Sequence, residues 1–176
     1  VYTANYNTNT VSKITPEGTV TPIFASLLSN TSPQNIDCDD LGNVYTANYS
    51  RDNVSKITPE GTLFESWAPL AINASPVDLA FDASGNLYTA DYEINAVSKI
   101  TPDGTVTQSW ATLAGGAGPV SIIVDASGDV YTANRNNTVS KISSDGTVTQ
   151  SWATLADNAS PSDIAVDALG NIYTVN

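Results

Sequence analysis

Short apolar runs alternate with polar turns along the whole chain, and no stretch keeps the 3.6-residue apolar period of a helix. Between residues 78 and 111, apolar runs at 78–82, 87–91, 96–101 and 105–111 are separated by segments rich in Gly, Pro, Asn and Asp. The runs contain many β-branched and aromatic residues, which is typical of strands. The pattern therefore predicts four short strands in this segment.

This order of strands repeats along the chain. The motif Val-Tyr-Thr-Ala-Asn begins at residue 1 and returns, with small changes, at residues 44, 87, 130 and 172. The units are 1–43, 44–86, 87–129 and 130–171, and 172–176 begins a fifth. Units of such length bury their apolar faces only against neighbouring units. We therefore expect an all-β fold, a β-propeller of tandem four-stranded blades, in one repeat array spanning residues 1–176.

Two polar turns recur in every unit. The first has the sequence Thr-Pro-Glu/Asp-Gly or, in the fourth unit, Ser-Ser-Asp-Gly; it fits a type I turn. The second is Asp-x-x-Gly, whose aspartate can accept hydrogen bonds from its own turn. A closed ring would bring these aspartates toward one face, as a candidate calcium site, although turn capping explains each one locally. The four residues are Asp39, Asp82, Asp125 and Asp167.

Three further side-chain types occupy repeated positions. Trp67, Trp110 and Trp152 share one position with Phe24, and we expect these aromatic rings to pack between adjacent blades. One lysine per unit lies beside Val and Ile, so its aliphatic stem should pack on a neighbour, with the ammonium near an aspartate or a carbonyl. Cys38 is the only cysteine, in a position held elsewhere by Phe or Val, which predicts a buried, inert thiol.

Composition excludes several functions. The 176 residues carry 18 acidic and 6 basic side chains, a net charge of −12, and no histidine. Nucleic-acid binding needs a basic surface, so we expect no nucleic-acid partner, and no apolar run is long enough for membrane insertion. The chain has no Ser/His/Asp or Cys/His set, no zinc spacing and no phosphate-binding glycine loop. We therefore expect no catalytic residues and no cofactor apart from calcium.

The chain is rich in Asn, Thr, Ser and Ala and poor in Lys, which favours an extracellular or cell-surface location. The same composition produces Asn-x-Ser/Thr sequons. Three of them occupy the same loop before a Ser-Pro pair and are candidate glycosylation sites, namely Asn30, Asn73 and Asn158. Departures from the repeat mark positions where blades differ: Asp37, Asp40, the pair Gly115-Gly116, and Arg135.

The pattern Pro-x-x-Ile-x-Val-Asp-x-x-Gly-Asn-x-Tyr, followed by Val-Ser-Lys-Ile-Thr-Pro-Asp-Gly-Thr, resembles NHL repeats and the streptogramin (virginiamycin B) lyase-like propellers. Pro161, Asp167, Gly170 and Tyr173 carry it, together with residues 97–105. The resemblance implies that the Ile-Ala-Val-Asp strand is innermost and the Trp-bearing strand outermost. The lyases work with histidine and glutamate around magnesium. Without histidine, this chain is not expected to be an enzyme.

The order of strands leaves incomplete blades at both ends. With A as the innermost strand, the first blade lacks strand A and the last unit lacks strands C and D. Strand 163–167 would complete the first blade if the ring closed, but two copies of strand B would then compete for one place. Candidate self-assembly residues lie in those copies: Val1, Tyr2, Thr3, Ile172, Tyr173 and Thr174. We expect a structural or interaction scaffold that self-assembles into a ring or filament. The alternatives are a recognition propeller that binds a glycan or peptide, and a degenerate lyase-like propeller.

Overall fold

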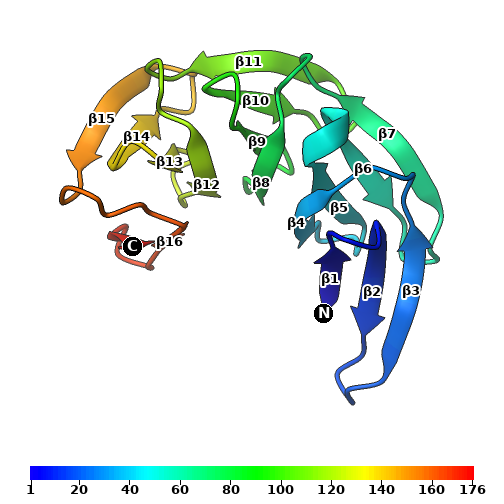
Figure 1. Ribbon diagram of the computed structural model, residues 1–176. Helices are drawn as coiled ribbons and strands as arrows, with labels where there is room; N and C mark the ends of the chain where they lie inside the picture. The colour runs from blue at the N-terminus through cyan, green and yellow to red at the C-terminus, as the bar shows by residue number, and fades with distance from the viewer.

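The computed structural model describes all 176 residues as an open arc of antiparallel sheets, with the two termini separated by a wide gap (Figure 1). The first sheet contains β1 (Tyr2–Asn5), β2 (Thr10–Ile14) and β3 (Val20–Ser26). The second contains β4 (Pro33–Cys38), β5 (Val44–Asn48), β6 (Asn53–Ile57) and β7 (Leu63–Pro69). The three-residue 3-10 helix η1 (Tyr49–Arg51) lies between β5 and β6.

The remaining sheets repeat this order. The third contains β8 (Pro76–Phe81), β9 (Leu87–Asp91), β10 (Ala96–Ile100) and β11 (Val106–Thr112). The fourth contains β12 (Pro119–Val124), β13 (Val130–Asn134), β14 (Thr138–Ile142) and β15 (Val148–Thr154). The fifth is the two-stranded hairpin of β16 (Asp163–Val166) and β17 (Ile172–Val175). These sheets are the β-propeller blades expected from the repeats, and we number them 1 to 5.

The strands occupy fixed positions within each blade. Strands β4, β8 and β12 line the concave side of the arc as strand A, and β3, β7, β11 and β15 form its convex side as strand D (Figure 1). The ring does not close through strand 163–167, because β16 pairs only with β17 and blade 1 stays three-stranded. The arc holds these two strands at opposite ends, too far apart for pairing (Figure 1).

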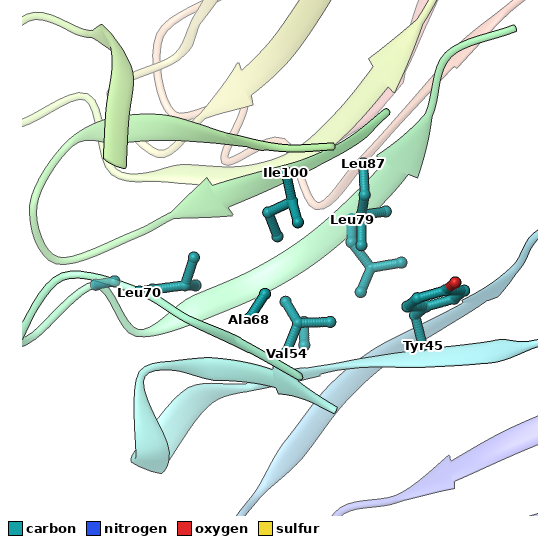
Figure 2. Close-up of a cluster of buried hydrophobic side chains, with 9 residues drawn as sticks. Tyr45, Val54, Ala68, Leu70, Leu79, Leu87 and Ile100 are labelled. Atoms are coloured by element: carbon teal, nitrogen blue, oxygen red, sulfur yellow. The ribbon is translucent and has the colours of Figure 1, made fainter. Parts of the chain in front are cut away.

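The apolar core lies between the blades, as expected for repeats that cannot bury their faces alone. One cluster joins Tyr45, Val54 and Ala68 of blade 2 to Leu87 and Ile100 of blade 3 (Figure 2). Equivalent clusters have nine buried residues at the blade 2–3 and blade 3–4 contacts, but four at each outer contact. The core therefore weakens toward both ends of the arc.

A series of hydrogen-bonded polar side chains joins strands B and C in blades 1 to 4, and in blades 1 to 3 it continues to strand D. In blade 2, Thr46 Oγ1 donates to Asn48 Oδ1 at 2.9 Å, and Asn48 Nδ2 donates to Ser55 Oγ at 2.7 Å. The Ser55 hydroxyl then donates to the Glu65 carbonyl of strand D at 2.6 Å. Because every polar side-chain atom in this hydrogen-bonded series has a partner, the series can be buried at little cost.

Adjacent blades interlock where a strand D aromatic ring lies against the glycine of the next blade's C–D turn. A methyl group on Gly104 would lie 3.1 Å from Trp67 Nε1, and one on Gly146 would lie at the same distance from Trp110 Nε1. The equivalent contact of Gly61 is with Phe24. The expectation that these aromatic residues pack between blades is therefore confirmed for Phe24, Trp67 and Trp110, whereas Trp152 packs against Tyr131 of its own blade and is 46% exposed. We call the contact between ring and glycine the aromatic–glycine seam.

The seam predicts that Gly104→Ala destabilises the chain more than Gly116→Ala. Both glycines have positive φ, +89° and +79°, but nothing lies within 4 Å of a methyl group on Gly116. Backbone strain at positive φ costs about 1–2 kcal/mol in each variant. Crowding against Trp67 should add about 1–3 kcal/mol in Gly104→Ala alone. Urea denaturation of both variants measures the difference, and equal losses of stability would contradict the seam.

Candidate interaction surfaces

Each aspartate of the proposed calcium ring caps its own turn. Asp39 Oδ1 accepts from the backbone N–H groups of Leu41 and Asn43, at 3.0 and 2.8 Å. Its Oδ2 accepts from Asn43 Nδ2 at 2.7 Å and from the Tyr45 hydroxyl at 2.9 Å. Partial burial raises the pKa of Asp39, but these hydrogen bonds outweigh it and leave the pKa below its ordinary value.

The structure does not bring the four aspartates together into one donor set. Asp82, Asp125 and Asp167 also accept hydrogen bonds from the backbone of their own turns and from the tyrosine six residues later. No group of three or more His, Cys, Asp or Glu side chains is arranged to hold a metal ion. Calcium binding by these residues remains a prediction, with turn capping as the role that the contacts explain.

The repeated lysines lie against aromatic rings. This differs from the expectation, which placed their ammonium groups near an aspartate or a carbonyl. Lys56 Nζ is 5.3 Å from the centroid of the Tyr45 ring and 5.4 Å from that of Trp67. Lys13 and Lys99 repeat this arrangement in blades 1 and 3. The ring faces attract the ammonium groups. Only Lys141 has the expected acidic partner, Asp129 Oδ2 at 2.8 Å, because Asp129 replaces the asparagine of other blades.

Open grooves lie between the A–B turns of neighbouring blades, and the lysines Lys56 and Lys99 line them. The groove between blades 2 and 3 has a volume of about 300 Å³ and includes Asp39, Asp40, Lys56 and Trp67 in its lining. The groove between blades 3 and 4 is similar, at about 320 Å³. This face therefore presents one mixed-charge groove at each of these two contacts.

Cys38 is exposed, so the expectation of a buried thiol is wrong. In the equivalent position of blade 3, Phe81 reaches the Tyr45 ring of the preceding blade at a centroid distance of 5.2 Å. The cysteine side chain is shorter and stays accessible. Partial burial, followed by the charge of Asp37, raises the pKa of the thiol, so the exposed sulfur is a weak nucleophile. Burial also raises the pKa of Asp37 itself.

The opposite face of the arc carries the B–C and D–A loops, and two sequence departures meet there. Gly116 and Arg135 line one shallow pocket of about 350 Å³ with Tyr92 and Glu93. The Arg135 guanidinium donates to the Tyr92 hydroxyl. The other three D–A loops hold an asparagine at the Gly116 position (Asn30, Asn73 and Asn158), so the glycine removes a side chain from this pocket. The structure thus joins residues that the sequence marked separately.

The candidate glycosylation residues share this loop face. Asn30, Asn73 and Asn158 are exposed, each at a D–A loop position with φ between 58° and 63°. A neighbouring asparagine or aspartate of the B–C loop holds the same loop in place. In blade 2, Asp52 accepts from the backbone N–H groups of Asn73 and Ser75, at 2.9 and 2.8 Å. The sequon side chains therefore project from ordered turns.

The candidate self-assembly residues lie at the two open ends of the arc. Tyr2 and Thr3 belong to β1, the free edge of blade 1, and Val1 is 81% exposed. Ile172, Tyr173 and Thr174 belong to β17, and Tyr173 is 57% exposed. The structure does not bring the two sets together in one chain. A hollow of about 470 Å³ lies between blade 4 and the terminal hairpin, with Trp152 on one side and Ile172 on the other.

Sequence analysis did not single out Asp91, the one residue that changes the buried polar chain of a blade. It replaces the asparagine found as Asn5, Asn48 and Asn134, and it is fully buried. Thr89 Oγ1 and Ser98 Oγ donate to its two carboxylate oxygens at 2.8 and 2.5 Å. Burial raises the pKa of Asp91 to about 7 despite these bonds. The available signal was the single Asn-to-Asp change within the repeated motif.

The comparisons with known proteins agree with this architecture. The family model described as the virginiamycin B lyase family matches residues 1–176. A streptogramin B lyase structure is similar to this chain, with a TM-score of 0.89 and 18% identity. The match covers 99% of this chain and 57% of the lyase chain. Virginiamycin B lyase from Staphylococcus aureus gives a TM-score of 0.89 and 19% identity. This match covers 99% of this chain and 58% of the lyase chain.

More distant propellers share the fold. A gluconolactonase from Xanthomonas campestris gives a TM-score of 0.63 and 16% identity, covering 92% of this chain and 60% of its own. No curated protein sequence matches this chain. The chain therefore spans somewhat less than 60% of the length of the two lyases. No helix in the structure has the length and apolar character to cross a membrane.

Asp91→Asn should stabilise the chain at high pH and have little effect at low pH. The folded-state pKa, about 7, lies above the ordinary value of 3.8, so the free energy of unfolding should fall as pH rises from about 4 to 7. Asparagine does not ionise, and the difference should reach on the order of 2–4 kcal/mol at pH 8. Thermal unfolding at pH 4 and pH 8 measures it.

The reciprocal variant Asn48→Asp is the matched control, because Asn48 holds the same position in blade 2 and is also fully buried. It should introduce a second loss of stability over the same pH range. A pH-independent effect of Asp91→Asn would contradict the prediction, because it would mean that folding does not raise the pKa of Asp91.

Proposed function

This chain belongs to the virginiamycin B lyase family, and we propose that it serves as a non-catalytic interaction scaffold, extracellular or on a cell surface, that self-assembles through its incomplete terminal blades. One observation carries the proposal. The strand D aromatic residues of blades 1 to 3 are covered by the next blade, but Trp152 of blade 4 is 46% exposed. Trp152 therefore presents to solvent an aromatic ring of the kind that contacts between blades partly cover elsewhere in the arc.

The backbone at both ends supports the same proposal. β1 has a free edge where blades 2, 3 and 4 carry strand A, and β17 has a free edge where they carry strand C. Unpaired strand edges are templates for pairing with another chain. Exposed apolar side chains occur in the same two blades, at Val20 and Ile23 of the outer strand β3 and at Val175 of β17.

The lack of histidine supports a non-catalytic role. A variant of the Staphylococcus aureus lyase with one histidine changed to alanine is described as catalytically inactive, in a structure with quinupristin. This chain has no histidine in its 176 residues. The third candidate function, a degenerate lyase-like propeller, keeps the fold of that enzyme without its chemistry.

The second candidate function is recognition of a glycan or peptide on the loop face. The observation that favours it is the pocket formed by Tyr92, Glu93, Gly116 and Arg135. An aromatic ring, two opposite charges and a missing side chain are features of a site that fixes a polar ligand. Blade 3 and blade 4 supply this pocket together, so it occurs once in the arc. The exposed sequons on the same face support an extracellular location.

The scaffold proposal predicts that the purified chain associates as its concentration rises. Light scattering should give a mass that grows from one chain, 18.4 kDa, to a two-chain ring or a filament. Electron microscopy of the same sample separates rings from filaments. Because the net charge is −12, assembly should be stronger at about 0.15 M salt than at low salt, where like charges repel.

A mass of one chain at every concentration would contradict self-assembly and favour recognition on the loop face. Magnesium-dependent turnover of quinupristin by this chain would contradict the non-catalytic part of the proposal.

A further inference from the structure

One position of strand A is polar in every blade that has this strand. The residue there stands opposite an alanine of strand B or, in blade 5, a valine. Because β8, β12 and β16 are the strand A elements of consecutive blades, their residues follow one another across two blade contacts (Figure 1). The four residues are Asn35, Asp78, Ser121 and Asp163.

The Asp78 carboxyl joins blade 3 to blade 4. Its Oδ2 accepts from the Ile122 N–H at 2.8 Å and lies 2.7 Å from Ser121 Oγ. Its Oδ1 accepts from the N–H of Leu79, the next residue, at 2.9 Å. Only 8% of Asp78 is exposed, so this contact between blades is shielded from water.

The Ser121 hydroxyl continues the contact to blade 5. Ser121 Oγ lies 3.0 Å from Asp163 Oδ1, which also accepts from the Ile164 N–H at 2.9 Å. Both distances from Ser121 Oγ to a carboxyl oxygen are those of hydrogen bonds, but a hydroxyl has one proton to donate. An ionised carboxylate can only accept. With both carboxylates ionised, one of the two contacts would therefore have no proton.

No basic side chain neutralises the two carboxyl groups, because all six are engaged elsewhere. The four lysines lie against aromatic rings, and the two arginines donate to a carbonyl and a tyrosine hydroxyl of the loop face. Burial raises the pKa of Asp78, its hydrogen bonds lower it by less, and the charge of Asp163 adds to the rise. The surroundings therefore favour a proton on Asp78.

We propose that Asp78, Ser121 and Asp163 share one added proton and form a pH-sensitive link between blades 3, 4 and 5. The proton resides on Asp78, the buried carboxyl, which donates to Ser121 Oγ while the Ser121 hydroxyl donates to Asp163. Formation of the link takes one proton from solvent. As pH rises, that proton is released, two like charges face one hydroxyl, and blade 5 is held less firmly on blade 4. This inference goes beyond the proposed scaffold function and does not depend on it.

The other titratable groups on the strands packed against β8 and β16 have partners of their own. The tyrosine hydroxyls donate to the aspartates of the A–B turns, and Asp91 accepts from Thr89 and Ser98. Asp37 accepts from the N–H of Cys38. None of these groups forms a hydrogen bond with the three residues of the link. The groups are Asp37, Cys38, Tyr45, Tyr88, Asp91, Tyr131 and Tyr173.

Asp163→Asn tests the link by removing one of its two charges, and Asn35 shows that asparagine fits this position of strand A. Because folding raises the pKa of Asp78 above 3.8, the link should stabilise the chain fully below that pH and lose its effect as pH rises. Asp163→Asn should therefore raise the unfolding temperature by about 2–4 °C at pH 8 and change it by less than about 1 °C at pH 3.

The comparison is made on the dilute single chain, with EDTA present to remove divalent cations. Parent and variants all carry Asp91→Asn, which removes the other buried carboxyl that titrates in this pH range. Asp157→Asn is the matched control, because it removes the same charge from an exposed position in the D–A loop before β16. Equal effects of Asp163→Asn and Asp157→Asn at pH 8 would overturn the link.

Carbon NMR of the Asp78 carboxyl follows the proton directly, a readout that a purely structural role of Asp163 would not change. The pKa of Asp78 should lie above 3.8 in the parent, and Asp163→Asn should lower it by about one pH unit because the like charge is gone. A parent value at or below 3.8, or the same value in Asp163→Asn, would contradict the proposal. Neither measurement involves assembly, so failure of the scaffold proposal would leave both results unchanged.

Discussion

The contact of a strand D aromatic ring with the glycine of the next C–D turn sets the spacing of the blades. The ring can approach because the glycine has no side chain, and the turn can form there because glycine accepts positive φ. Trp67 and Trp110 then close the apolar clusters that hold blades 2, 3 and 4 together. A repeat array has no central core, so its stability is the sum of such contacts between neighbours. The outer contacts, with four buried residues each, hold blades 1 and 5 less firmly than the nine-residue clusters hold the central blades.

Polar groups give each blade its internal order. The aspartate of the A–B turn accepts hydrogen bonds from its own turn. The series Thr–Asn–Ser, with Asp91 in place of the asparagine in blade 3, ties strand B to strand C and, in blades 1 to 3, to strand D. Both devices are local and repeat with the sequence, so they leave the loop face free to vary between blades. Variation is visible there in Gly116 and Arg135, which form a pocket at one blade contact only. A shared framework with variable loops suits a scaffold, and in relatives the same framework supports a lyase.

The repeat pattern was sufficient to predict the strands, the turns, the propeller fold and the place of the tryptophans, because each depends on neighbours in sequence or on the next identical unit. Expectations failed where position in the arc or side-chain length mattered. Cys38 is exposed because its side chain is too short to fill the position that Phe81 fills in blade 3. The lysines lie against aromatic rings of neighbouring strands, a contact that forms only in the folded blade. Strand D of blade 3 contains a bulge, in which the three residues between Thr107 and Ala111 lie opposite the single residue Ser98. The sequences of the turns do not predict this bulge. Asp91 was missed because its burial comes from tertiary packing.

Native-state hydrogen exchange, resolved by strand on the dilute single chain, tests most directly whether contacts between blades hold this fold together. If they do, the amides of β5, β9 and β13, whose residues are all buried between two neighbouring blades, should exchange most slowly. Those of β1 and of the β16–β17 hairpin, each with a neighbouring blade on one side only, should exchange fastest. Equal protection in terminal and central blades would contradict this account, because it would mean that each blade is stable without its neighbours.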